Sequence, residues 1–289
     1  MKFKNLLQEY LEHSKDVKSD RSYKAEISLT NVILRCFESL EIKTVDCLKY
    51  ESINDIIRYC RVKTKRKNNS TNKLIKHIKL ALRHFGFRNH EFLSTKLLSS
   101  DTKSFKVLDS DDLSIILEYA KNRNKNQNDL LYYGLVTFLY ETGCRIDELT
   151  NIKIDNINIK NRVILLEKTK NDKERYVPFT EASVTLMKRL IEASPSDYLF
   201  WNQLKKRKLC YNDTRHFFEE LTGETGINNI HNHRFRKAMA TELIMAGGTI
   251  DSAQVLLGHK SRLTTELYVN VNHLFALKEY NELMNKKRA

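Results

Sequence analysis

Six side chains suited to holding or attacking a phosphodiester occur in the later half of this 289-residue sequence. They are Arg145, Lys170, His233, Arg236, His259 and Tyr268. The last four share one stretch, from HNHRFR to TTELY, whereas the first two stand in TGCRIDEL and KTKNDKERYVPF. Cationic side chains bind phosphate oxygens, and a phenol can act as a nucleophile. The set therefore favours phosphodiester chemistry that needs no metal ion or other cofactor.

Each of these residues also has an ordinary structural interpretation when it is taken singly. Arg236 lies on the inner stripe of its predicted helix, where a carboxylate could neutralise its guanidinium. Arg145 could form an ion pair with Glu148 three residues later, and such a pair contributes only tenths of a kcal/mol. Lys170 could be a solvated charge in a turn, a single histidine more often packs than reacts, and Tyr268 is one of 13 tyrosines.

The sequence predicts a mainly α-helical fold with a small antiparallel β-sheet. Only eight glycines and two prolines interrupt it, and β-branched runs are few. A helix should begin at Asp109 or Ser110, and the nearly apolar segment LLYYGLVTFLYETG should form a buried central helix. RVILLEK and ERYVPF predict a β-hairpin at about 162–179, with Pro178 at a strand end or on an edge strand.

The length suits two domains, since each could bury its own core. We expect a helical domain at residues 1–98, a polar linker at 99–108 and a second domain at 109–289. The formal net charge is +14, and residues 51–100 carry 12 Lys or Arg against 3 Asp or Glu. Such a block favours a polyanion such as nucleic acid. A lysine-rich solvated face is the alternative interpretation.

A basic loop and the helix that follows it are the candidate DNA-backbone contacts of the first domain. The helix should begin after Ser70-Thr71, which could cap it, and end at Gly86, with its basic residues facing away from its apolar stripe. Phosphate contacts need positive charge and little sequence precision. The candidate contacts are Arg61, Lys63, Lys65, Arg66, Lys67, Lys76, Lys79 and Arg83.

Cysteine usage and hydropathy indicate the cellular compartment of the protein. Five scattered cysteines without a CxxC pair favour reduced thiols over disulfides or a zinc site. No apolar run reaches the length of a membrane span, and MKFKNLLQEYLEHSK predicts an amphipathic helix rather than a signal peptide. We therefore expect a cytoplasmic protein that has no membrane partner.

Taken together, five motifs give the chain a specific resemblance to the tyrosine recombinase family, which includes phage integrases and Xer-type enzymes. TGCRIDEL, KNDKERYVP, HNHRFR, LLGHKS and TTELY occur in the order and with the internal spacing of that family. The resemblance covers about residues 105–275 and implies a mixed α/β catalytic domain there. The basic helical N-terminal part resembles the family's core-binding domain by character rather than by motif. Lys237 stands where a histidine is common, and Arg234 lies between His233 and Arg236, but neither replaces a catalytic position.

The resemblance implies a role for each of the six residues. Arg145 and Arg236 would be the arginine pair of the family, and Lys170 its hairpin lysine. His233 and His259 would be the two histidines, and Tyr268 the nucleophile. The arginines and the second histidine would hold the non-bridging phosphate oxygens. The first histidine would accept the phenol proton, and the lysine, eight residues before Pro178, would protonate the leaving 5′ oxygen. The product would be a 3′-phosphotyrosyl link.

The resemblance also implies the partners. The substrate would be a double-stranded DNA recombination site, on which monomers assemble into a homotetramer, and directionality or host factors could take part. A helix after Tyr268 would dock on its own domain or into a neighbouring protomer. From the length we expect only the core-binding and catalytic domains, without the arm-binding domain of many phage integrases, which favours a Xer-like, transposon or plasmid-resolution role.

Two other functions stay open at this point. An inactivated relative would only occupy DNA, but all six catalytic positions are filled. A type IB topoisomerase would nick and relax DNA with the same chemistry, and the compact chain with its LGH…Y spacing favours recombination instead.

Overall fold

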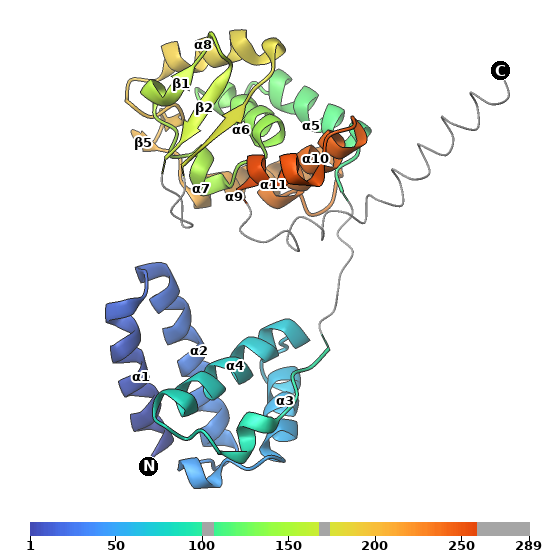
Figure 1. Cartoon of the computed structure of the whole chain (residues 1–289). Coiled ribbons are helices and arrows are strands. Elements are labelled where there is room, and N and C mark those ends of the chain that lie inside the picture. The colour runs from blue at the N-terminus through green and yellow to red at the C-terminus, as the bar shows by residue number, and fades with distance from the viewer. Residues whose placement is uncertain (100–106, 168–173, 259–289) are drawn as a thin grey trace, which may run out of the picture. The chain divides into compact units, whose positions relative to one another are not determined.

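The chain divides into two compact units, Met1–Ser104 and Phe105–Ala289. The computed structural model describes residues 1–99, 107–167 and 174–258, and Figure 1 shows the elements of each unit. Within these ranges the fold is mostly helical with small antiparallel sheets, as the sequence predicts. No helix in the same ranges is long and apolar enough to cross a membrane. The roles assigned to the two units, and the linker at 99–108, stay predictions.

The N-terminal unit is a set of helices around one apolar core. Its described helices are α1 (Phe3–Val17), α2 (Asp20–Ser39), α3 (Ser52–Val62) and α4 (Asn68–His84), with 3-10 turns η1 (Val45–Cys47) and η2 (Glu91–Ser94). The predicted amphipathic helix at the N-terminus is confirmed, because α1 buries Leu6 and Leu7. α4 buries Leu74 and Ile78 on the stripe that packs against α1 and α2. Burial of these stripes holds the helices together.

The predicted start of α4 is wrong by one turn. The helix begins at Asn68, after Lys67, and no side chain caps its first amides. Thr71 is fully buried inside the helix, so it is a core residue rather than a cap. At the other end Gly86, with φ of +80°, follows the last helical turn as predicted.

The C-terminal unit is built around α6. Its described helices are α5 (Ser110–Asn122), α6 (Asp129–Thr142), α7 (Ile146–Leu149), α8 (Val184–Ala193), α9 (Tyr211–Thr225), α10 (Asn232–Met245) and α11 (Ile250–Leu257). α6 contacts α5, α8 and α10, and its Leu135, Val136 and Phe138 have no exposed surface. This confirms the prediction of a central buried helix. The predicted cap of α5 is also confirmed, since Asp109 Oδ1 accepts from the Asp112 amide at 2.9 Å.

A three-stranded antiparallel sheet carries the predicted hairpin. Its strands, in spatial order, are β1 (Ile157–Asn158), β2 (Val163–Leu166) and β3 (Arg175–Pro178), flanked in sequence by 3-10 turns η3 (Ile154–Asn156) and η4 (Glu181–Ser183). Ile164 pairs with Val177 and Leu166 with Arg175. Pro178 ends the edge strand, where its missing N–H breaks no ladder. A second pair, β4 (Trp201–Asn202) with β5 (Arg207–Lys208), was not predicted because two-residue strands leave no alternation to detect.

Candidate active site

Gly143 lets α6 end directly against α10 and α11. Its φ is +58°, and a Cβ at this position would lie 2.5 Å from Met239 Cε and 2.9 Å from Leu257 Cδ2. A larger residue would be strained at this φ, and the side chains of Met239 and Leu257 would have to move. The glycine therefore permits a close approach of the end of α6 to α10 and α11, two residues before Arg145.

The guanidinium of Arg236 is buried where these elements meet. The residue is 2% exposed, which confirms the prediction that it faces inward from α10. Its Nη1 donates to the Gly143 carbonyl at 2.7 Å, and its Nη2 donates to the Leu257 carbonyl. Both acceptors belong to helix C-terminal ends, where backbone carbonyls lack helical partners and the helix dipole favours a cation. Arg236 thus fixes the ends of α6 and α11 while carrying a full positive charge.

Arg145 lies at the N-terminal end of α7, where its side chain and its backbone amide both bond Glu148. Arg145 Nη1 donates to Glu148 Oε1 at 2.8 Å, and the Arg145 amide donates to Glu148 Oε2 at 2.8 Å. The ordinary ion pair considered from the sequence therefore exists. However, the Glu148 side chain is 5% exposed and the Arg145 side chain 31%. The buried carboxylate orients a guanidinium that still faces solvent, and this geometry leaves Arg145 accessible to an anion.

His233 lies one turn before Arg236 on α10 and remains exposed. Partial desolvation lowers the pKa of His233, and the positive charges of His231, Arg236 and Arg145 lower it further. The imidazole is therefore neutral at neutral pH and able to accept a proton. Arg236 bonds the carbonyl of Gly143, two residues before Arg145, and His233 lies one turn before Arg236 on α10, so the three predicted residues lie close together.

Glu148 also binds a second arginine, Arg175, which the sequence interpretation did not single out. Arg175 Nη2 donates to Glu148 Oε2 at 2.6 Å, and Nη1 donates to Oε1 at 3.2 Å. Burial alone would raise the pKa of Glu148, but the hydrogen bonds from Arg175 and Arg145 bring it to about 2. The sequence did hold a signal: Arg175 is in phase with the buried Val177 on one strand, so its side chain points toward the core.

Three of the six predicted residues, Lys170, His259 and Tyr268, lie outside the described residues. Lys170 belongs to the connection between β2 and β3, and His259 follows the glycine that ends α11. The structure thus brings Arg145, His233 and Arg236 together. It also describes β2 and α11, which precede Lys170 and His259 in the sequence.

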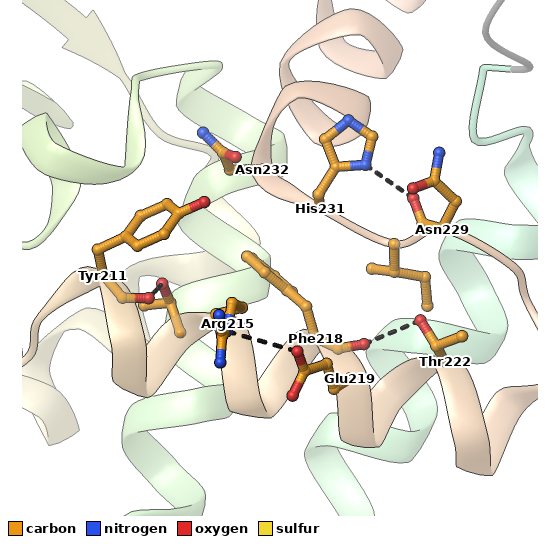
Figure 2. Close-up of a pocket in the computed structure, with 10 residues that line it drawn as sticks. Tyr211, Arg215, Phe218, Glu219, Thr222, Asn229, His231 and Asn232 are labelled. Carbon is orange, nitrogen blue, oxygen red and sulfur yellow. Dashed lines mark hydrogen bonds and ion pairs between the residues drawn. The ribbon is translucent and has the colours of Figure 1, made fainter. Parts of the chain in front are cut away.

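A groove of about 360 Å³ lies beside this site, between α9 and the loop that enters α10 (Figure 2). Tyr211 and Arg215 line it from α9, and His231 lies across from them at the start of α10. The ring centroids of His231 and His233 are 6.3 Å apart. Arg215 pairs with Glu219 within the groove at 3.4 Å. The groove neighbours the candidate site but does not contain the arginine pair.

Most of the predicted DNA-contacting residues of the N-terminal unit are exposed. The exposed ones are Arg61, Lys63, Lys65, Lys67, Lys76 and Arg83, and Arg66 is half-buried. They follow the end of α3, the connection to α4, and one face of α4. We refer to these exposed residues, with Arg66, as the basic set of the N-terminal unit.

Lys79 departs from that set, and the expectation that its amine faces away from the core is wrong. The residue is 9% exposed, and its ammonium donates to the Leu93 carbonyl at 3.0 Å and to the Thr95 carbonyl. Burial lowers the pKa of Lys79, and the nearby Arg83 adds to this effect. Residues 91–95 fold back onto α4, a tertiary contact that helical periodicity alone does not predict.

The sequence pattern of the phage integrase family matches residues 106–274, more than half of the chain, and the six predicted catalytic residues fall within this range. The chain belongs to the phage integrase family. Membership makes it an enzyme of the tyrosine recombinase class, whose members are site-specific DNA recombinases.

Two curated relatives illustrate this membership. A probable integrase/recombinase of Acholeplasma phage L2 is 31% identical to this integrase-family chain over 283 residues, which cover 98% of each protein. Tyrosine recombinase XerC of Leptospira interrogans serovar copenhageni is 29% identical over 176 residues, which cover 59% of this chain and 55% of XerC.

Solved structures agree with the fold of the family. The Tn1549 transposon integrase, in complex with a circular intermediate DNA, matches with a TM-score of 0.78 at 17% identity, covering 93% of this chain and 94% of that one. A lambda integrase dimer bound to a core site matches with a TM-score of 0.75 at 16% identity, covering 93% and 77%. At these identities the similarity shows the fold alone.

Proposed function

We propose that this family member is a site-specific DNA recombinase that cuts and rejoins strands through a 3′-phosphotyrosyl intermediate on Tyr268. The observation that carries the proposal is the convergence of Arg145, His233 and Arg236 from α7 and α10. A partly exposed guanidinium, a buried guanidinium and a neutral imidazole in one place match what the transfer of a phosphodiester requires.

In the proposed cleavage step, the Tyr268 hydroxyl attacks the scissile phosphorus while the bond from phosphorus to the 5′ oxygen breaks. His233 accepts the phenol proton, and Lys170 donates a proton to the departing 5′ oxygen. A phenol with a pKa near 10 is about 0.1% ionised at pH 7, which corresponds to roughly 4 kcal/mol. A neutral base and nearby cations reduce this deficit. The phosphotyrosyl bond conserves the energy of the broken bond, so the reverse step joins a new 5′ hydroxyl without ATP.

Arg145, Arg236 and His259 would hold the non-bridging oxygens as negative charge grows on them. The buried position of Arg236 suits this role, because a charge shielded from water interacts more strongly with a phosphate. Its two backbone contacts fix the guanidinium before the substrate arrives, so little reorganisation is needed during the reaction.

We propose that the basic set of the N-terminal unit contacts the phosphate backbone of a double-stranded recombination site. The set includes Arg61, Lys63, Lys65, Arg66, Lys67, Lys76 and Arg83, and it omits Lys79, whose amine is committed to two carbonyls. Support comes from solved family members in complex with DNA. In this proposal monomers assemble into a tetramer on cytoplasmic DNA of a mobile element or replicon, and a directionality or host factor could bias the outcome.

The rate of cleavage should rise with pH and level off with a midpoint below 6.5, the ordinary pKa of histidine. His233 acts as a base only when it is unprotonated, and its lowered pKa moves that transition toward acid. Single-turnover cleavage between pH 5 and 8 measures this profile. His233→Gln should be slower and should lose the acid limb, whereas a wild-type midpoint above 6.5 contradicts a depressed pKa.

Lys76→Gln should make DNA binding less sensitive to salt, whereas Lys79→Gln should not. Both residues lie on α4, but Lys76 is exposed and Lys79 is buried. Each lost phosphate contact reduces the slope of log K against log salt by about 0.9. Titrations between 50 and 200 mM salt measure the slopes. Equal slopes for both variants and wild type would mean that Lys76 on α4 makes no phosphate contact.

Recombination of a plasmid tests the proposed function as a whole. Sequencing the DNA that stays attached to the denatured protein first maps the target site. A plasmid with two copies of that site should then yield recombinant circles in EDTA and without ATP. A ladder of relaxed topoisomers without recombinants would indicate a relaxing enzyme instead, and binding without strand joining would indicate an inactive relative.

A further inference from the structure

The guanidinium of Arg175 joins three segments that lead into the proposed catalytic residues. It bonds the Glu148 carboxylate through Nη1 and Nη2, and Glu148 in turn holds Arg145. Its Nε donates to the Leu256 carbonyl in the last turn of α11 at 2.9 Å. Arg175 itself opens β3, five residues after Lys170. One side chain therefore links α7, α11 and the hairpin.

Gly258 makes the contact between α11 and Arg175 possible. Its φ is +63°, and a Cβ there would lie 3.0 Å from Arg175 Nη1 and 3.1 Å from its Cζ and Nε. The backbone before His259 thus rests directly on the guanidinium. The adjacent carbonyls of Leu256 and Leu257 are bound by two different arginines, Arg175 from the sheet and Arg236 from α10.

The chemistry of these contacts requires arginine. Three nitrogens of one planar group are used at once, two on a carboxylate and one on a carbonyl that points from another element. A lysine ammonium could keep the charge, but it has no planar fork for bidentate binding. The Arg175 side chain is 10% exposed, and each of its three nitrogens already donates to a protein oxygen.

We propose that Arg175 is a positioning residue for the cleavage reaction: through Glu148 it orients Arg145 toward the non-bridging oxygens of the scissile phosphate. The inference rests on the proposed function and assigns the hairpin a second task beside carrying Lys170. Without Arg175 the Glu148 carboxylate would turn to Arg145 alone and draw its guanidinium away from the substrate. The expected consequence is a slower chemical step with unchanged affinity for DNA, because a displacement of about 1 Å at a reacting group can cost on the order of 100-fold in rate.

The test compares Arg175→Lys with Arg123→Lys, a control that also removes a guanidinium from a carboxylate. Arg123 is buried against Glu220 and Asp129 in the contact between α5 and α9, on elements that carry none of the six predicted catalytic residues. Single-turnover cleavage is measured on a nicked duplex of the mapped site, once with the natural phosphodiester and once with a methylphosphonate at the scissile position. The methyl group replaces a charged non-bridging oxygen, so it removes the negative charge that Arg145 is proposed to bind.

Arg175→Lys should cleave the phosphodiester on the order of 10- to 100-fold more slowly than wild type. On the methylphosphonate its deficit should shrink to within about threefold, since the interaction that it supports is absent there. Duplex affinity and thermal stability, measured in parallel, should match those of Arg123→Lys. A deficit of equal size on both substrates would mean a merely structural role and overturn the proposal, as would a wild-type rate on the phosphodiester. If wild type itself forms no covalent product, the proposed function fails first, so the two failures are distinct.

Discussion

Tyr268→Phe is expected to form no covalent protein–DNA adduct on a nicked suicide duplex, while wild type accumulates one. Such a substrate loses its short 5′ fragment after cleavage, so the phosphotyrosyl protein cannot religate. Removing the nucleophile of an enzyme lowers its rate by roughly 10⁵-fold or more. The adduct is measured as a slow band after denaturing electrophoresis with labelled DNA.

Tyr280→Phe is the matched control, because Tyr280 is a nearby tyrosine that falls outside the motif spacing. This variant should form the adduct at the wild-type rate. Duplex binding should be unchanged in both variants, since each loses only a hydroxyl. An adduct that survives Tyr268→Phe, or disappears in Tyr280→Phe, would assign the reaction to another residue.

Arg236→Lys is expected to bind duplex DNA normally and to cleave it about 10²- to 10³-fold more slowly. That range is the usual cost of one lost donor to a developing oxyanion. Lysine keeps the positive charge, but it cannot donate at once to a phosphate and to the carbonyls of Gly143 and Leu257. Single-turnover rates at saturating protein separate this loss from any loss of affinity.

Arg236→Ala should also be less stable, by about 2–5 kcal/mol, because two buried carbonyls lose a charged donor. Arg123→Ala supplies the control, since it also removes a buried arginine from carboxylates. It should lower the thermal midpoint while each folded molecule cleaves at the wild-type rate. Wild-type cleavage by Arg236→Lys, with binding intact, would contradict a phosphate contact for this arginine.

Residue spacing correctly predicted the elements whose buried face can be recognised from their own sequence. The apolar sequence of α6 and the inward face of Arg236 on α10 depend only on spacing along one helix, and both are confirmed. The hairpin of β2 and β3 was also predicted from its own residues, because two β-rich stretches flank a polar turn. The family resemblance then grouped Arg145, His233 and Arg236, although neither helix alone indicates that they lie close together.

Contacts between segments far apart in sequence were missed. Lys79 looked like a solvated charge because its carbonyl partners lie 14 and 16 residues later, beyond the helix that defines its periodicity. The bond from Arg175 to Glu148 spans 27 residues, and that to Leu256 spans 81. Such partners follow from tertiary packing, in which a buried charge must find an opposite charge or hydrogen-bond acceptors.

Identifying the amino acid that carries the DNA is the most direct test of the proposed mechanism. The adduct formed by wild type on the mapped site is digested with protease and nuclease, and the modified peptide is sequenced by mass spectrometry. We expect a nucleotide joined through its 3′ phosphate to the phenolic oxygen of Tyr268. A nucleotide on any other side chain, or one joined through a 5′ phosphate, would contradict the mechanism.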